Sequence, residues 1–450
     1  MKTIEVTEWI NQQRISRLQI LVLVLCAAAA ALEGFDTQSI GFVAPSVIHE
    51  WHLAPKDFTP AFVVGLLGLL VGCLVIAPLA DWIGRKKLLV GTSLWFGVFS
   101  LLTAEASTMS TLSILRFLTD AGLGGGMANA IALTSEYFPA RKRAAMTVVM
   151  FCGFPLGASL GGFLAAALIP RYGWPSVFVL GGILPILLAI VLVFTLPESI
   201  RYLVLKRRAQ ERVAAILRRI NPRASFAQGT TFAIAEEQRS GLTVGHLFRE
   251  GRAAGTVLLW MMFFMNLLGL FLLTSWLPTL LHDAGLSISM AVVIISVQQG
   301  SGVIASIAAG PILERRSCVS LLLPLFVLSG LGIAAIGSVG ASVPLILAAA
   351  AISGIGSVTG QNVANALAAV YYPTYIRATG VGWALGIGRI GAIVGPTVGG
   401  LMLALHWTTS SIFLFGAVPS FIAAAAALTM MWVEGRRETT VAPASVTVAR

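Results

Sequence analysis

The sequence predicts an all-α membrane protein in which twelve transmembrane helices form two pseudo-symmetric six-helix bundles. Of its 450 residues, 57% are hydrophobic and only 11% are charged, whereas a soluble domain carries about 25% charged residues. Apolar runs of about twenty residues or more recur along the chain, and each can cross a hydrocarbon core of about 30 Å. The second half of the chain also repeats residues of the first half at a constant offset, which predicts two related bundles.

The apolar runs define the expected helices in order. We expect membrane spans over residues 18–45, 58–80, 87–106, 110–136, 145–169, 176–196, 255–281, 288–311, 318–337, 343–370, 379–405 and 410–433. This order predicts an N-terminal six-helix bundle (1–196), a cytoplasmic linker (197–254) and a C-terminal six-helix bundle with a cytoplasmic tail (255–450). Apolar residues between positions 200 and 220 recur at helical spacing, which predicts an amphipathic helix at the membrane surface.

The net charge of +11 follows from the topology and does not indicate a nucleic-acid partner. Of the 30 Lys and Arg residues, only Lys56 and Arg171 fall on one side, and Arg116 and Arg389 fall within spans, which leaves 26 on the other side. This is the positive-inside pattern, so we expect both termini in the cytoplasm and the protein in the bacterial inner membrane. The four cysteines and five histidines show no disulfide or ligand spacing, so we expect no metal and no cofactor.

The internal repeat appears when the second half is shifted back by 234 positions. The aligned pairs are Tyr137 with Tyr371, Pro139 with Pro373, Arg143 with Arg377, Gly157 with Gly391, and Gly161 with Gly395. The alternative explanation is a convergent Gly- and Ala-rich composition. Arg116 aligns with Ala350 and Arg389 with Pro155, so each of these charges occurs once. A charge needed only for the fold is expected in both copies, so both arginines are predicted to serve a ligand or a proton.

Two acidic residues, Glu33 and Asp36, lie inside the first apolar segment. Their spacing of three places both carboxylates on one helical face. Each carboxylate costs roughly 2.5–3.5 kcal/mol at the centre of a span, so such residues are usually functional. We expect Asp36 to carry a proton and Glu33 to assist it in a proton-driven carrier of organic anions. The alternative is that either acid only satisfies polar contacts between helices.

The loop after the second span resembles a signature of the major facilitator superfamily. Residues 77–87 read APLADWIGRKK, which resembles G-x-x-x-D-R-x-G-R-K, with Ala77 and Trp82 as departures. The resemblance implies a conformational latch between the two bundles, whereas the alternative role of the charges is topological only. The implied latch residues are Asp81, Gly84, Arg85, Lys86, Glu136, Arg143, Glu314 and Arg377.

Within that superfamily, the chain is most similar to the aromatic acid:proton symporters. Residues 33–45 (EGFDTQSIGFVAP) resemble that family's D-G-F-D-T-x-x-I-G-F-x-A-P, and stretches in 116–137, 276–281 and 388–396 resemble its fourth, seventh and eleventh spans. Glu33 and Asp120 depart from the family, which usually has Asp and Gly there. The resemblance implies a carrier that imports benzoate-like acids together with protons for aromatic hydrocarbon catabolism.

An aromatic carboxylate in a low-dielectric cavity needs a cation, and arginine offers a planar fork that matches two oxygens. Arg389 is the first candidate because it lies near mid-depth in its span, and Arg116 is the second because Asp120 could pair with it. Aromatic and amide side chains could hold the ring and its hydroxyl groups. These candidates are Phe35, Trp276, Trp383, Tyr371, Gln298, Gln299, Asn266 and Asn362. The alternative for each is helix packing or interhelical hydrogen bonding.

We therefore predict a monomeric, proton-coupled importer of aromatic carboxylates that works by alternating access of its two bundles. The nearest alternative is a proton-coupled efflux antiporter. The antiporter pattern G-x-x-x-G-P-x-x-G-G occurs at 391–400 in the eleventh span and not in the fifth, which favours uptake. A membrane sensor of aromatic acids is a further alternative. An enzyme is not expected, because no nucleophile–base pair, metal cluster or nucleotide motif is present.

Overall fold

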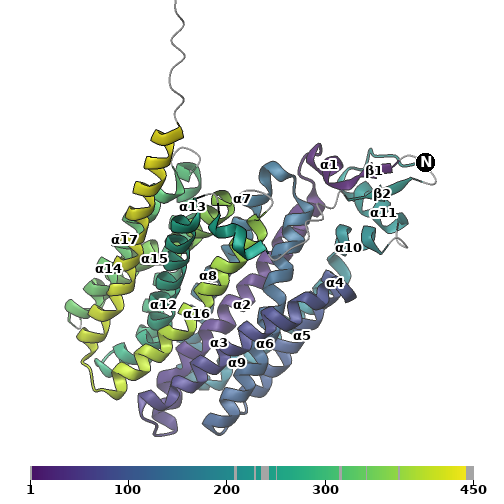
Figure 1. Cartoon of the computed structure of the whole chain (residues 1–450). Coiled ribbons are helices and arrows are strands. Elements are labelled where there is room, and N and C mark those ends of the chain that lie inside the picture. The colour runs from purple at the N-terminus through teal and green to yellow at the C-terminus, as the bar shows by residue number, and fades with distance from the viewer. Residues whose placement is uncertain are drawn as a thin grey trace, which may run out of the picture.

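In the computed structural model, the described part of the chain forms one elongated helical bundle and runs along its length twelve times (Figure 1). The structure describes residues 3–206, 210–227, 230–234, 243–249, 251–313, 317–340, 342–372 and 376–441. The first six passes are α2 (Arg17–Glu50), α3 (Thr59–Val71, extended by η2 Gly72–Ile76 and η3 Ala77–Leu79), α5 (Arg85–Thr103), α6 (Met109–Tyr137), α7 (Ala140–Phe151) continued by α8 (Gly153–Tyr172), and α9 (Pro175–Thr195). The last six are α12 (Ala253–Asp283), α13 (Ile288–Leu313), α14 (Cys318–Ser338), α15 (Val343–Tyr371), α16 (Arg377–Ala404) and α17 (Thr409–Val441).

These passes confirm the twelve predicted spans. By length and composition alone, ten described helices could cross a membrane, and α5 and α6 are not among them. The basic residues Arg85, Lys86 and Lys87 at the start of α5 lower its mean hydropathy. The polar and charged residues of α6, including Arg116 and Asp120, do the same for that helix. Both helices nevertheless pack within the bundle, so tertiary contacts and not hydropathy hold them in place.

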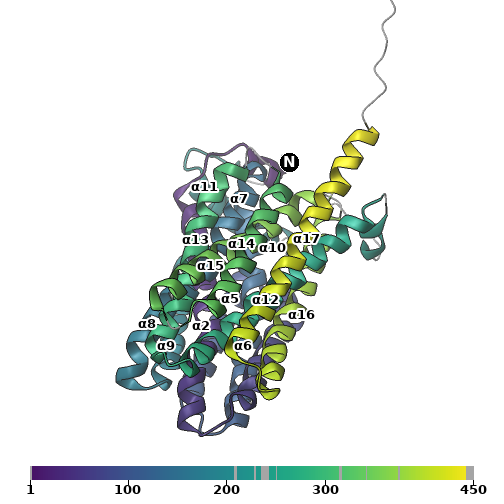
Figure 2. The same cartoon turned by 90° about the vertical axis from the view of Figure 1, so that its left-hand side faces the viewer.

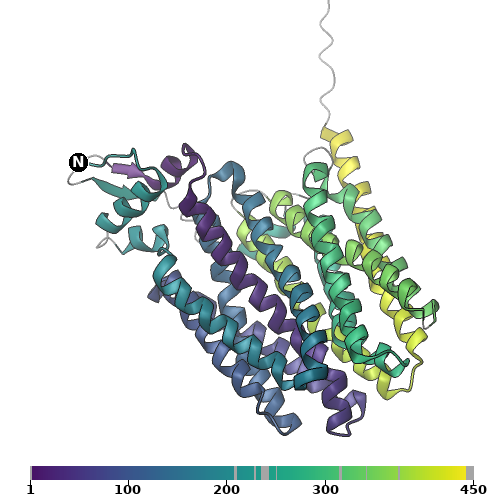
Figure 3. The same ribbon diagram turned by 180° about the vertical axis from the view of Figure 1, so that it is seen from behind.

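The two halves pack with the same helix pairing. In the N-terminal half, α2 packs on α8, α6 on α3 and α5, and α9 on α5. In the C-terminal half, the equivalent helices pair in the same way: α12 with α16, α15 with α13 and α14, and α17 with α14. Figure 3 shows the halves side by side, and Figure 2 shows the C-terminal half with α14 and α17 toward the viewer. The pairing confirms the predicted pseudo-symmetry.

Contacts between the halves gather at one end of the bundle. The helix α2 begins and α17 ends at the same end, here called the terminal end, and the opposite end is called the far end (Figure 1). Toward the far end, a Cβ atom on Gly41 of α2 would lie 2.5 Å from the Thr274 carbonyl oxygen of α12. Ser159 of α8 donates a hydrogen bond to the Ser296 carbonyl of α13 (2.8 Å). Backbones that approach this closely require small residues, and they seal the far end.

The linker differs from the single surface helix that the sequence predicted. It contains α10 (Ile200–Leu205), α11 (Gln210–Ile220), strand β2 (Thr231–Ala233) and the short helix η4 (Thr243–Phe248). Strand β1 (Thr3–Glu5) pairs in parallel with β2, and the short helix α1 (Val6–Asn11) follows it. The apolar face of α11 is buried in one cluster with Val6 and Ile10 of α1. The apolar residues of this helix therefore pack inside the protein, where α11 contacts α10, α2 and β2.

Candidate functional site

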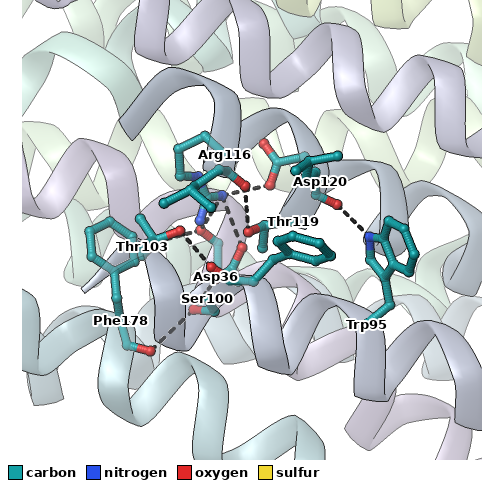
Figure 4. A network of polar contacts seen from close by, with 12 residues as sticks. Asp36, Trp95, Ser100, Thr103, Arg116, Thr119, Asp120 and Phe178 are labelled. Carbon is teal, nitrogen blue, oxygen red and sulfur yellow. Dashed lines mark hydrogen bonds and ion pairs between the residues drawn. The ribbon is translucent and has the colours of Figure 1, made fainter. Parts of the chain in front are cut away.

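A buried ion cluster joins α2 and α6 in the N-terminal half (Figure 4). The Arg116 Nη2 atom donates to Asp36 Oδ2 at 2.9 Å and to Asp120 Oδ1 at 2.6 Å. Ser100 of α5 donates to Asp36 Oδ1 (3.2 Å) and lies 3.1 Å from the Phe178 carbonyl oxygen of α9. Asp36 and Arg116 are fully buried, and Asp120 is 5% exposed. One guanidinium therefore faces two carboxyl groups in a site without bulk water.

Arg116 forms ion pairs with both acids and does not border the central cavity described below. Its Nε and Nη1 atoms have no hydrogen-bond partner among the described residues. The guanidinium lies 5.7 Å from the centroid of the Phe178 ring. The pairing with Asp120, which the sequence offered as an alternative role for Arg116, is thus present in the structure.

Glu33 lies one helical turn from Asp36 toward the terminal end and is also buried. Its Oε1 atom has no hydrogen-bond partner in the part of the chain that the structure describes. The side chain borders a small void together with Thr92, Phe96 and Gly126.

A central cavity lies between the two halves, on the terminal side of the far-end contacts, and its volume is about 740 Å³ when the part open to solvent is included. The N-terminal half contributes apolar side chains, and the C-terminal half contributes all the polar ones. The lining residues are Met127, Phe151, Phe154, Pro155, Leu267, Leu270, Phe271, Gln299, Val358, Gln361, Asn362, Asn365, Leu385 and Arg389. The cavity is large enough for a small ligand.

Arg389 of α16 is the charged residue in this lining. None of the described residues forms an ion pair or hydrogen bond with its side chain. Arg116 differs, because its guanidinium pairs with the carboxyl groups of both Asp36 and Asp120. A guanidinium that borders a cavity without a protein partner is able to bind an anion by two parallel hydrogen bonds.

Amide side chains surround this cation and form a chain of hydrogen bonds. Asn266 Nδ2 donates to Gln361 Oε1 at 3.0 Å, and Gln361 Nε2 donates to Asn365 Oδ1 at 3.2 Å. Asn362 Nδ2 donates to Ser306 Oγ at 2.9 Å. Three of these amides border the cavity and leave donors and acceptors for a ligand. The rings of Phe151, Phe154 and Phe271 supply apolar walls, so the cavity fits a flat, partly apolar anion.

The structure brings three predicted ligand residues into the cavity: Arg389, Gln299 and Asn362. Asn266 lies behind them and holds Gln361. The other predicted residues point elsewhere. Three of them donate hydrogen bonds to other helices or to the linker: Gln298 to Ser353 Oγ (3.0 Å), Trp276 to the Pro396 carbonyl (2.9 Å) and Tyr371 to the Arg252 carbonyl (3.1 Å). Trp383 is 44% exposed and stacks on Trp260. Phe35 packs against Gly161.

Sequence reasoning missed Phe151, Phe154, Phe271, Gln361 and Asn365. The internal repeat contains a signal for part of this set. At the same offset of 234 positions, Met127 aligns with Gln361, Phe151 with Leu385, and Pro155 with Arg389, and all six line the cavity. The N-terminal residues that align with Arg389 and its neighbours in the repeat therefore form the wall of the cavity that faces them.

The predicted latch residues that the structure describes lie at the terminal end. Arg85 Nε pairs with Glu136 Oε1 at 3.1 Å, and Ser199 Oγ donates to Glu136 Oε2 at 2.5 Å. The Lys86 backbone N–H donates to Glu198 Oε1 at 2.9 Å, next to Gly84, whose φ of +101° favours glycine. These contacts stay within the N-terminal half and linker. Arg143 is partly buried, whereas Glu314 and the side chains of Asp81 and Arg377 lie outside the described residues.

No group of three or more His, Cys, Asp or Glu side chains in the described ranges could hold a metal ion.

Comparisons with known proteins show which family and which relatives this chain resembles. The sequence profile of the Major Facilitator Superfamily matches residues 26–343 and 314–448. The chain is 40% identical to the 4-hydroxybenzoate transporter PcaK of Pseudomonas putida over 426 residues, covering 94% of both chains. It is also 40% identical to the gallate transporter of Pseudomonas putida, with the same coverage. Identity to the 3-(3-hydroxy-phenyl)propionate transporter of Escherichia coli is 34%, over 92% of this chain and 94% of that one.

Two solved structures share the fold at low sequence identity. The xylose transporter XylE of E. coli, in an inward open conformation, has a TM-score of 0.69 at 15% identity and covers 92% of this chain and 95% of its own. A bacterial homologue of the human lysosomal transporter Spinster has a TM-score of 0.67 at 15% identity, over 92% of this chain and 97% of that chain.

Proposed function

The chain belongs to the major facilitator superfamily and, within it, to the aromatic acid transporters, and from this premise we propose that it imports aromatic or related carboxylates together with protons. As a member of this superfamily, it is a multi-pass membrane transporter and not an enzyme. The names of its relatives include 4-hydroxybenzoate, gallate and benzoate transporters. Each of those substrates carries one carboxylate on a single ring.

The observation that carries the proposal is that Arg389 borders the central cavity and has no hydrogen-bond or ion-pair partner among the described residues. A substrate carboxylate would bind its guanidinium through two charge-assisted hydrogen bonds. The substrate ring would lie against Phe151, Phe154 and Phe271, because the apolar wall of the cavity faces the arginine. Amides such as Asn362 would bond ring hydroxyl groups. This arrangement uses both halves for one ligand.

Proton coupling is assigned to Asp36 and Glu33. Import of a monoanion against an inside-negative potential costs about 2.3 kcal/mol per 100 mV, and one accompanying proton cancels that charge. Glu33 and Asp36 both lie on α2, which packs against α12 and α13 of the C-terminal half. Rocking of the two halves would therefore change the surroundings of the acids and of the binding site in the same step.

The position of the cavity supports transport by alternating access. The far end is closed by contacts between α2 and α12 and between α8 and α13, while the cavity lies on the terminal side. Because most of the basic residues lie at the terminal end, we assign that end to the cytoplasm and the protein to the bacterial inner membrane. The described conformation then faces inward. Rocking of bundles 1–196 and 255–450 about the cavity, with the linker 197–254 between them, would open the far end.

The latch residues would act in the opposite state of this cycle. When the far end opens, Asp81, Arg85 and Glu136 of the N-terminal half would approach the equivalent loop of the C-terminal half, which contains Glu314. Ion pairs across that boundary would then hold the terminal end closed.

Uptake of labelled 4-hydroxybenzoate into vesicles tests the function. Under an imposed pH gradient, the acid should accumulate inside vesicles that contain the protein as a monomer. Without the gradient it should only equilibrate. Gradient-driven export alone would overturn the proposed direction and favour an antiporter. Tight binding without any crossing would favour a sensor.

A further inference from the structure

The ion cluster of α2 and α6 is unbalanced in charge. It contains the carboxyl groups of Asp36 and Asp120 but only the guanidinium of Arg116, and all three side chains are buried. With both carboxyl groups ionised, the cluster would hold one uncompensated negative charge in a low-dielectric site, which is costly. One bound proton removes that charge. Charge balance therefore favours a cluster that contains exactly one titrating proton.

No other group around the cluster supplies the missing positive charge. Glu33, on α2, is the other titratable residue nearby, and its negative form would add to the repulsion. The packed faces of α3, α5 and α9 carry no acidic or basic side chain at this depth. Arg389 lies in the other half and borders the central cavity, which none of the three cluster residues lines. The proton must therefore be held by the two aspartates themselves.

The two carboxyl groups differ in their contacts. Asp36 accepts hydrogen bonds at both oxygens, from Ser100 and from Arg116. Asp120 accepts a bond from Arg116 at Oδ1 only. Its Oδ2 atom lies where a Cβ on Gly65 of α3 would stand, so that glycine makes room for the carboxyl group. The Asp120 carboxyl group is therefore the one with an oxygen left for a proton.

Asp120 also has a route to the boundary between the halves. It borders a second, small cavity that Gln38 and Gly41 of α2 share with Thr274 and Ser275 of α12. Phe271 lines both this cavity and the central one. The second cavity lies at the far-end contacts, so separation of α2 from α12 would open it to the far side.

We propose that Asp120 is a further proton-coupling residue: the cluster of Asp36, Arg116 and Asp120 binds one proton, shared by its two carboxyl groups, which enters and leaves through Asp120. The proposal rests on the proposed proton-coupled uptake. In the far-side-open state, water donates a proton to the Asp120 carboxylate. In the inward-facing state, the same proton returns to water on the terminal side. The two carboxyl groups then titrate as one coupled unit.

Transport by the purified protein in proteoliposomes tests this proposal with an Asp120→Asn variant. With one proton per substrate, a pH gradient of one unit drives about tenfold accumulation in the native protein. Asp120→Asn should only equilibrate 4-hydroxybenzoate under that gradient, yet retain exchange of internal for external substrate. The matched control is Thr119→Val in the same helix, because the Thr119 hydroxyl bonds only the Leu115 carbonyl. The control should accumulate substrate normally.

Two transport outcomes would overturn the proposal. Full accumulation by Asp120→Asn would show that the residue only pairs with Arg116. Loss of both accumulation and exchange, in a variant that elutes as a folded protein, would show a structural role.

A second measurement does not depend on transport. Infrared difference spectra across a pH titration report the carbonyl band of a protonated carboxyl group. A Glu33→Gln background removes the signal of that neighbouring acid. The band should be present in the Glu33→Gln protein and in the Glu33→Gln/Thr119→Val protein. It should be absent from the Glu33→Gln/Asp120→Asn protein. Its absence from the background protein would overturn the proposal. If the band is present but no acid crosses, the proposed function fails while the proton site remains.

Discussion

The two halves share one helix pairing but differ in where they place charge. The N-terminal half buries three acids and Arg116 in its interior, whereas the C-terminal half places Arg389 on the central cavity, with the amides of Gln299 and α15 along the same lining. In the internal repeat, Arg389 aligns with Pro155 and Arg116 aligns with Ala350, so neither charge has a counterpart in the other half. The duplicated scaffold thus supports two different chemistries. One half is suited to hold protons and the other to hold an anion.

The largest expected effect comes from joining the halves covalently. A Cβ on Gly400 of α16 would lie 3.1 Å from the Thr59 Cβ of α3, so cysteines at both positions can approach disulfide distance. In a protein whose four native cysteines are replaced, Thr59→Cys with Gly400→Cys should lose all transport after oxidation and regain it after reduction. Uptake by each single variant is the control. Unchanged uptake by the oxidised pair would mean that the halves need not separate at the far end.

Arg389→Ala should remove substrate binding from the C-terminal half. Truncation of one partner of a buried charged pair costs about 2 kcal/mol or more, which raises Kd about thirtyfold. The Kd of Arg389→Lys should lie between those of the native protein and Arg389→Ala, because an ammonium group keeps the charge but lacks the planar fork. Calorimetric titration with 4-hydroxybenzoate measures the change. A Kd within about twofold of the native value in Arg389→Ala would remove Arg389 from the site.

Asp36→Asn should affect coupling and leave binding intact. The change leaves one acid for one arginine, so the cluster no longer needs a proton. Accumulation under a pH gradient of one unit should fall from about tenfold to equilibration, while exchange persists. Parallel assays of accumulation, exchange and binding separate these effects. An Asp36→Asn protein that accumulates substrate normally, or one that loses binding as Arg389→Ala does, would erase the contrast between the halves.

The smallest expected effect concerns the apolar wall. Phe154→Ala removes a ring that faces the substrate, and aromatic contacts of about 0.5–1.5 kcal/mol predict a twofold to tenfold rise in Kd. Trp383→Ala is the matched control, because that ring is 44% exposed and stacks on Trp260 away from the cavity. The control should change Kd by less than about twofold. A larger effect of Trp383 than of Phe154 would place the substrate elsewhere.

Sequence reasoning recovered the site in part. Arg389 was predictable because a lone arginine at mid-depth in a span is costly without a function. Phe154 was not, because phenylalanine is ordinary in a membrane helix and only packing decides which rings border a cavity. The pairing of Arg116 with Asp120 followed from helical spacing, but the additional contact with Asp36 required the position of α2 against α6.

The sequence by itself determined the number of spans, their order and the repeated halves, because hydropathy and periodicity are local properties of the chain. It also determined that Glu33, Asp36, Arg116 and Arg389 lie within apolar helices. Only the tertiary structure decided which of these charges neutralise one another and which one borders the cavity. Burial of α11 beneath the N-terminal segment was likewise decided by packing. Such contacts join residues far apart in the chain, and their energies depend on distances that no local pattern contains.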